Sequence, residues 1–438
     1  MNRRSYLNAL LGQIRCKRAW PMIEEELQGH IDEQKRDFMA AGMSEQEAEA
    51  AAVLEMGDPF EVGRQLDKIH RPRLPYPLIG FIIGLSSIGV ALQIAINKLI
   101  EMGDGFGLYG RYVQDMFAGM GIGIILMVMI CRMDYRVLGK YAMRLWAVLN
   151  GVIVLQVIAG MFMGRTLYLR MNVVSCMLIL SFAGVIYHYK DKGIKGLFKC
   201  VGWYIIAIFL LLPGLRWSFN YIALFYVTGA ILIFVASVKK WFGGNRAKQT
   251  MITVGMIVGV TAVMALIGIG IYYHYLVQYQ QDRVIAAMQL SGDVPFNIEE
   301  MLKRMSLVMN DSANVMILDE DAMTLTSIRS DYLFTFVFKC LGSWQGILIT
   351  VLVAAFLVLL CVLVHKQKNP LGYILSLAAL LMVGIQSLLY FGINLGYLPS
   401  TAIAMPFFTG GKTNMLITYI CMGLLLSVYR NQNLIPEN

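Results

Sequence analysis

The sequence predicts an all-α, polytopic membrane protein of about ten transmembrane helices that follow a small helical domain. Of its 438 residues, 58% are hydrophobic and only 15% are charged, whereas soluble domains carry about 25% charged residues. The apolar residues also occur in runs long enough to cross a bilayer. The net charge of +9 is typical of loop lysines and arginines that face anionic membrane lipids, so no nucleic-acid partner is expected.

Residues 1–75 are expected to form a cytoplasmic helical prefix domain of four short helices. The first lies within Met1–Arg18, which has leucines at helical spacing, and the second runs over 21–42. The third begins at the capping box Ser44–Glu47, and the fourth begins after Asp58. Because these start and stop signals are local, the segment is predicted to fold as a unit of its own.

A proline-rich linker at 71–77 leads into the transmembrane domain, which takes up 76–438. The approximate ranges of the ten expected spans are 77–98, 112–131, 145–164, 172–188, 200–214, 217–238, 250–272, 332–364, 371–391 and 413–429. The fifth span is short and contains Pro213, which is typical of a broken or re-entrant helix. The eighth is long and is expected to begin as a ledge at the membrane face.

The distribution of basic residues predicts the orientation. The short loops that share a side with the N-terminus carry more lysine and arginine than the loops on the other side. Since such residues stay in the cytoplasm, both termini are expected there, with the long loop 273–331 outside. A multi-pass protein of the bacterial cytoplasmic membrane is therefore predicted.

Cysteine, histidine and glycine give further expectations. None of the seven cysteines falls in the long loop, so no disulfide framework is expected, and the five histidines lack metal-ligand spacing, so no metal site is expected. Three glycine groups have the small-xxx-small spacing of helix-packing sites. They are Gly119 to Gly123, Gly80 with Gly84, and Gly255 with Gly259.

Asp331 lies where the long polar loop meets the eighth span. A carboxylate that is dry on one side and wet on the other suits a general base, because partial desolvation raises its pKa toward neutrality. The alternative is a helix-start aspartate that caps free backbone N–H groups. The surrounding sequence alone leaves both interpretations open.

The stretch 394–411 is rich in glycine and proline, and such irregular backbone at a membrane face must be buried in protein or line a cavity. It resembles the hallmark motif of the FtsW/RodA/SpoVE family, the SEDS proteins. The residues shared with that motif are Asn394, Gly396, Leu398, Pro399, Thr401, Pro406, Phe407, Thr409 and Gly411. The opening of the eighth span, 330–342, resembles a second family motif that contains an aspartate at the position of Asp331. Asp134–Arg136 and Tyr279 to Arg283 are weaker matches.

This resemblance covers about 77–430 and implies a peptidoglycan glycosyltransferase that polymerises lipid II on the outer membrane face. Asp331 would be the catalytic base. The candidate substrate-binding residues are Arg283, Lys339, Thr401, Pro406, Thr409 and Lys412, of which the basic ones would contact the departing pyrophosphate. The cofactor is unknown: a divalent cation would assist the pyrophosphate, although no ligand cluster argues for one. The partners that the resemblance implies are a class B penicillin-binding protein and membrane lipids.

Several family motifs are altered, and these departures support an alternative. Lys339 and Cys340 replace the family's glutamate pair, and the glycine after Thr401 is Ala402. The chain would then be a catalytically weakened scaffold or regulator in cell division, elongation or sporulation.

The prefix segment also resembles a known group, the helical prefix domains that precede permeases in Gram-positive bacteria. The shared residues are Glu26-Leu27, His30-Ile31, Gly42 to Ser44, Glu47-Ala48 and Met56 to Pro59. This resemblance implies a cytoplasmic interaction or regulatory module, and the alternative is a solvated cap without a partner. A permease is a third hypothesis, but no repeat halves or matched broken helices favour it.

Overall fold

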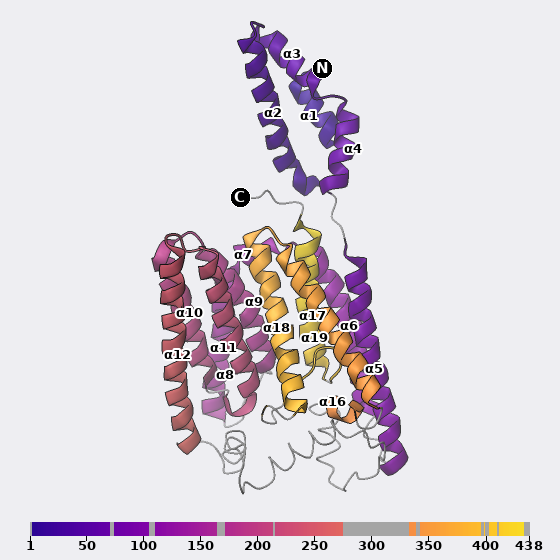
Figure 1. The fold of residues 1–438 in the computed structure, drawn as a ribbon, viewed down its shortest axis with the longest axis vertical. Helices are drawn as coiled ribbons and strands as arrows, with labels where there is room; N and C mark the ends of the chain where they lie inside the picture. The colour runs from indigo at the N-terminus through magenta and orange to yellow at the C-terminus, as the bar shows by residue number, and fades with distance from the viewer. Residues whose placement is uncertain are drawn as a thin grey trace.

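The computed structural model describes residues 2–70, 74–104, 110–163, 171–212, 215–274, 333–338, 342–395, 398, 403–409 and 411–432. Every regular element within these ranges is a helix, as the sequence predicts. Figure 1 shows a bundle of long helices, with four short helices beyond the end of the bundle at which its first helix begins.

The short helices match the four expected in the prefix segment. They are α1 (Arg3–Leu11), α2 (Trp20–Ala40), α3 (Glu45–Glu55) and α4 (Pro59–His70), with a 3-10 turn at Lys17–Ala19. The predicted capping box is present, because the backbone N–H of Ser44 donates to the Glu47 carboxylate at 3.2 Å. Gly42 and Gly57 adopt φ values of 98° and 81°, which is the left-handed conformation that ends α2 and α3.

These helices enclose an apolar core of their own. Tyr6 and Leu10 from α1 lie against Ile23 and Ile31 from α2, and all four side chains are at most 1% exposed. Gly63 allows α4 to approach closely, because a Cβ at this position would lie 2.7 Å from the carbonyl oxygen of Leu10. This separate core is consistent with a segment that folds on its own.

In the described part of the chain, ten helices of 18 to 29 residues form the bundle. They are α5 (Tyr76–Asp104), α6 (Gly110–Arg132), α8 (Ala142–Met163), α9 (Met171–His188), α10 (Gly193–Leu211), α11 (Leu215–Val238), α12 (Arg246–His274), α17 (Ser343–His365), α18 (Pro370–Asn394) and α19 (Lys412–Arg430). Each corresponds to one expected span. Among the described residues, nine of these helices are long and apolar enough to cross a membrane, and in α9 the apolar stretch Val173–His188 is shorter.

Two spans differ from their expected boundaries. The fifth, α10, begins at Gly193 instead of 200 and runs unbroken to Leu211. Pro213, where a break was expected, lies outside the described residues. The eighth, which was expected to begin as a ledge, contains a short helix α16 (Leu333–Phe336) before the long α17. Gly342, with a φ of 110°, directly precedes α17.

The glycine predictions are correct at one place and wrong at two. A Cβ at Gly123 in α6 would lie 2.1 Å from the ring of Tyr419 in α19, so these two helices approach closely there. In contrast, a Cβ added at Gly84 on α5 or at Gly255 on α12 would meet nothing within 4 Å. The same holds for Gly80 and Gly259. These four glycines are exposed. The prediction failed because a periodic spacing does not say which face of a helix packs against another helix.

The helices of the bundle differ in how deeply they are buried. Along α18, 61% of the apolar stretch is buried, whereas only 6% of the corresponding stretch of α12 is buried. Figure 1 shows α12 at the edge of the bundle and α18 within it. Most of the α12 surface is therefore not covered by the rest of the bundle.

Candidate functional site

The expected site lies at the end of the bundle away from the prefix helices, where α16 packs against α18 and the segment between α18 and α19 begins (Figure 1). Residues 403–409 of that segment are non-helical, and all are buried. For 403–409, this confirms the expectation that the irregular backbone is buried in protein. A buried loop must find partners for its backbone polar groups within the protein.

Side chains from two membrane helices supply partners for the loop carbonyls. Gln93 of α5 donates from Nε2 to the carbonyl oxygen of Phe408 at 3.1 Å, and Gln386 of α18 donates to that of Ala404 at 2.6 Å. Both glutamines are at most 5% exposed. The two amides therefore hold the loop between an early and a late helix of the bundle.

Thr409 closes the loop on itself. Its Oγ1 accepts a hydrogen bond from the backbone N–H of Met405 at 2.5 Å and donates to the Met405 carbonyl oxygen at 3.2 Å. The Thr409 side chain is 1% exposed, and Pro406 beside it is also buried. Both are candidate substrate-binding residues, and in this conformation they shape the loop.

Phe407 has a φ of 69°, which is an unusual backbone conformation for a residue with a bulky side chain. Its ring packs edge-on against Phe356 and Tyr419, with centroid distances of 5.5 Å and 5.9 Å. Gly89 of α5 accommodates this turn, since a Cβ there would lie 2.2 Å from the Phe407 carbonyl oxygen. Close approach of α5 to the loop thus depends on a glycine at this position.

Asn394, the first residue of the hallmark motif, anchors α16. Its Oδ1 accepts hydrogen bonds from both the backbone N–H and the hydroxyl of Thr335, each at 3.1 Å, while its Nδ2 donates to the carbonyl oxygen of Tyr390 at 2.9 Å. Asn394 is fully buried and Thr335 is 7% exposed. The hallmark asparagine therefore fixes a residue four positions after Asp331.

Thr335→Val is expected to loosen this anchor. Removal of the hydroxyl takes away one of the two hydrogen bonds to Asn394 Oδ1 and leaves buried polar groups short of partners, which costs about 1–3 kcal/mol. The melting temperature of the purified chain should fall accordingly. Thr350→Val is the matched control, because the Thr350 hydroxyl donates to the Gly346 carbonyl oxygen within its own helix. Equal melting temperatures for the two variants would contradict the anchoring role.

Lys412, the first residue of α19, forms an ion pair with Asp115 of α6. Its Nζ lies 2.6 Å from Asp115 Oδ1, and the two side chains are 50% and 44% exposed. Asp115 was not expected from the sequence, although it is the only acidic residue between Asp104 and Asp134. The pair keeps a cation and a carboxylate accessible at the same end of the bundle as α16.

The structure does not describe the other four candidate residues. Asp331, Arg283, Lys339 and Thr401 lie outside the described residues. The part of the chain that is described contains no group of three or more His, Cys, Asp or Glu side chains arranged to hold a metal ion.

The weaker motif Asp134–Arg136 forms an ion pair at the opposite end of the bundle. Arg136 Nη2 lies 2.8 Å from Asp134 Oδ2, and its Nε donates to both carboxylate oxygens. These hydrogen bonds raise the pKa of Arg136 despite the opposing effect of burial. The motif thus fixes the turn after α6 and lies away from α16.

Known proteins share both sequence and fold with this chain. The family model of the FtsW/RodA/SpoVE cell cycle proteins matches residues 319–434. A probable peptidoglycan glycosyltransferase FtsW of Halorhodospira halophila is 30% identical over 106 residues, which cover 23% of this chain and 27% of that protein. The FtsW of Geobacter metallireducens, described in the same words, is 26% identical over 21% of this chain and 26% of its own. The matched part therefore spans about a quarter of the length of these relatives.

Solved structures share the fold over a longer range. A chain from a peptidoglycan synthase complex, studied for its coordination of polymerization and crosslinking, superposes with a TM-score of 0.61 at 15% identity and covers 82% of this chain and 98% of its own. The crystal structure of the Thermus thermophilus rod shape determining protein RodA gives 0.53 at 13% identity and covers 82% and 97%.

Proposed function

Because this chain is a member of the FtsW/RodA/SpoVE family of cell cycle proteins, we propose that it is a peptidoglycan glycosyltransferase that polymerises lipid II. The observation that carries the proposal is the anchoring of Thr335 by Asn394, since it couples the hallmark motif to the segment that follows Asp331. A catalytic group must be held near its productive position by a rigid surrounding, and buried hydrogen bonds provide such rigidity.

In the proposed reaction, Asp331 takes the proton of the acceptor sugar hydroxyl. The hydroxyl oxygen attacks the anomeric carbon of the donor, and the bond between that carbon and the lipid pyrophosphate breaks. Lys412 is one candidate for contact with the departing pyrophosphate, and Asp115 Oδ1 lies 2.6 Å from its Nζ. Arg283 and Lys339 are further candidates because of their positive charge.

The test is glycan chain formation from lipid II by the purified full chain, alone and with a class B penicillin-binding protein, the proposed partner. Polymer formed only by preparations that contain this chain supports the proposal. The altered motifs, above all Lys339 in place of a glutamate, favour a scaffold as the second candidate. If no polymer forms with or without the partner, the enzymatic proposal fails and the scaffold is retained.

We also propose that both termini lie in the cytoplasm and the 273–331 loop lies outside. The loops that share a side with the N-terminus carry the excess of basic residues. Ser291→Cys should therefore react with a membrane-impermeant thiol reagent in intact cells stripped of their wall. Ser44→Cys, in the prefix segment, should react only after the membrane is permeabilised. The reverse pattern would contradict this orientation.

We propose that residues 1–75 form a separable domain that docks a cytoplasmic partner. Its four helices enclose their own core, and a proline-rich linker follows. A fragment of residues 1–75 is expected to be helical by circular dichroism and to unfold cooperatively. A fragment without helical signal would contradict the proposal of a separable unit.

A further inference from the structure

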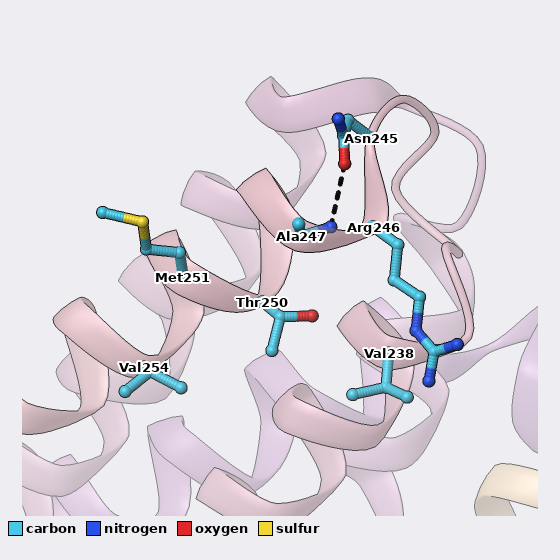
Figure 2. Close-up of a pocket in the computed structure, with 7 residues that line it drawn as sticks. All are labelled: Val238, Asn245, Arg246, Ala247, Thr250, Met251 and Val254. Atoms are coloured by element: carbon cyan, nitrogen blue, oxygen red, sulfur yellow. Dashed lines mark hydrogen bonds between the residues drawn. The ribbon is translucent and has the colours of Figure 1, made fainter.

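An open hollow of about 680 Å³ lies between the end of α11 and the start of α12. Val238, Met251 and Val254 line it with apolar atoms, whereas Arg246 and Thr250 contribute polar groups. Figure 2 shows the guanidinium of Arg246 beside Val238. The Asn245 side chain points away, and its Oδ1 accepts a hydrogen bond from the backbone N–H of Ala247. The hollow thus combines an apolar wall with a cation.

This hollow is at the opposite end of the bundle from α16 and from the start of α19 (Figure 1). It is open to the outside of the protein. Met251 and Val254 are 79% and 43% exposed, and α12 is buried over only 6% of its apolar stretch. The space in front of these side chains is therefore filled by lipid when the chain is in a bilayer.

The charge around the hollow is positive on balance. The nearest acidic residue along the chain on the N-terminal side is Asp191, whose backbone N–H donates to the Trp241 carbonyl oxygen at 2.7 Å and whose carboxylate pairs with Lys190 at 3.1 Å. The segment 192–281 contains no aspartate or glutamate, while 239–248 contains Lys239, Lys240, Arg246 and Lys248. Arg246 and Lys248 are exposed and form no ion pair with any carboxylate among the described residues. Lys239 is placed differently, with its Nζ 3.6 Å from the centroid of the Tyr373 ring.

We propose that this hollow binds an anionic diacyl phospholipid, with Arg246 at the headgroup phosphate and an acyl chain along Met251 and Val254. A basic pocket between transmembrane helices at the membrane surface attracts anionic headgroups. An arginine suits phosphate because its planar guanidinium donates two parallel hydrogen bonds. Because the wall below the cation is apolar, it matches an acyl chain and offers little to a free phosphate ion.

The affinity for phosphatidylglycerol is measured by native mass spectrometry on the detergent-purified full chain. Arg246→Gln should weaken it about fivefold, since this is the contribution of one basic residue at an anionic membrane surface. Lys366→Gln is the matched control, because Lys366 is an exposed basic residue at the end of α17, on the same side of the bundle. The control should change the affinity less than twofold.

A second variant tests the hollow without changing its charge. Thr250→Trp fills the space below Arg246 and should weaken the binding of phosphatidylglycerol at least fivefold. The melting temperature should stay close to that of the parent chain. Phosphatidylcholine, which has the same acyl chains and no net charge, should bind the parent chain at least fivefold more weakly than phosphatidylglycerol.

Three results would overturn the proposal. Equal losses in Arg246→Gln and Lys366→Gln would indicate a diffuse attraction to the whole basic surface. Unchanged binding in a folded Thr250→Trp variant would exclude the hollow as the site. Displacement of the lipid by inorganic phosphate at the same concentration would show that the acyl chain contributes nothing.

Discussion

Asp331→Asn is expected to lower the rate of glycan formation from lipid II by about 10²–10⁴-fold, the usual cost of losing general base catalysis. Asparagine keeps the size and the hydrogen-bonding capacity of the side chain but does not accept the proton of the acceptor hydroxyl. If Asp331 only caps a helix, asparagine caps nearly as well, and the change should cost well under about 1 kcal/mol of stability. The rate and the melting temperature of the variant therefore separate the two interpretations.

Asp319→Asn is the matched control, since it makes the same chemical change within the same long loop. It should keep the parent rate. An Asp331→Asn variant that is folded and polymerises lipid II at nearly the rate of the parent would exclude Asp331 as the base. An inactive parent chain would instead support the scaffold hypothesis.

Gly89→Ala is expected to have the largest effect on stability among single methyl additions in α5. The new Cβ would lie 2.2 Å from the Phe407 carbonyl oxygen and 3.0 Å from the Phe408 Cα, and both are backbone atoms. The loop has little freedom to retreat, because Phe407 is already in a left-handed conformation and packs against Phe356 and Tyr419. Overpacking of this kind costs about 1–3 kcal/mol or more.

Gly84→Ala provides the comparison within the same helix. Its Cβ would meet nothing within 4 Å, and alanine is favoured over glycine in a helix by about 0.5–1 kcal/mol. The melting temperature should thus fall for Gly89→Ala and stay level or rise for Gly84→Ala. A Gly89→Ala protein as stable as its Gly84 counterpart would show that α5 and the loop are not closely packed. Since the loop carries the hallmark motif, glycan formation should also fall with Gly89→Ala.

The hydropathy of the sequence was sufficient to predict the helices of the bundle, because a span of the membrane needs a long apolar run. It misplaced the start of α10 because Lys195 and Lys199 look like loop residues, whereas the structure has both within the helix. Lysines near a helix end remain helical when their long side chains reach the membrane surface. The Ser44–Glu47 capping box was predicted correctly, because a capping box depends only on residues that are close in the sequence.

The contacts that build the candidate site could not be predicted in this way. The bond from Thr335 to Asn394 joins residues 59 positions apart, and the Lys412–Asp115 pair joins the first residue of α19 to α6. Neither pair has a periodic or local signature. The sequence motif pointed to Asn394 as a family residue, but only the packed bundle shows that it anchors α16.

The hydrogen bond from Gln93 to the Phe408 carbonyl joins residues that are 315 positions apart. A ribosome adds about 5–20 residues each second, so α5 is made roughly 15–60 s before that acceptor exists. A second hydrogen bond, from the Tyr419 hydroxyl to Ser86 Oγ, forms later still, because Tyr419 is made after Phe408. The final position of α5 in the bundle is therefore set only when the last helix has entered the membrane, and chains released early would leave α5 without its binding site.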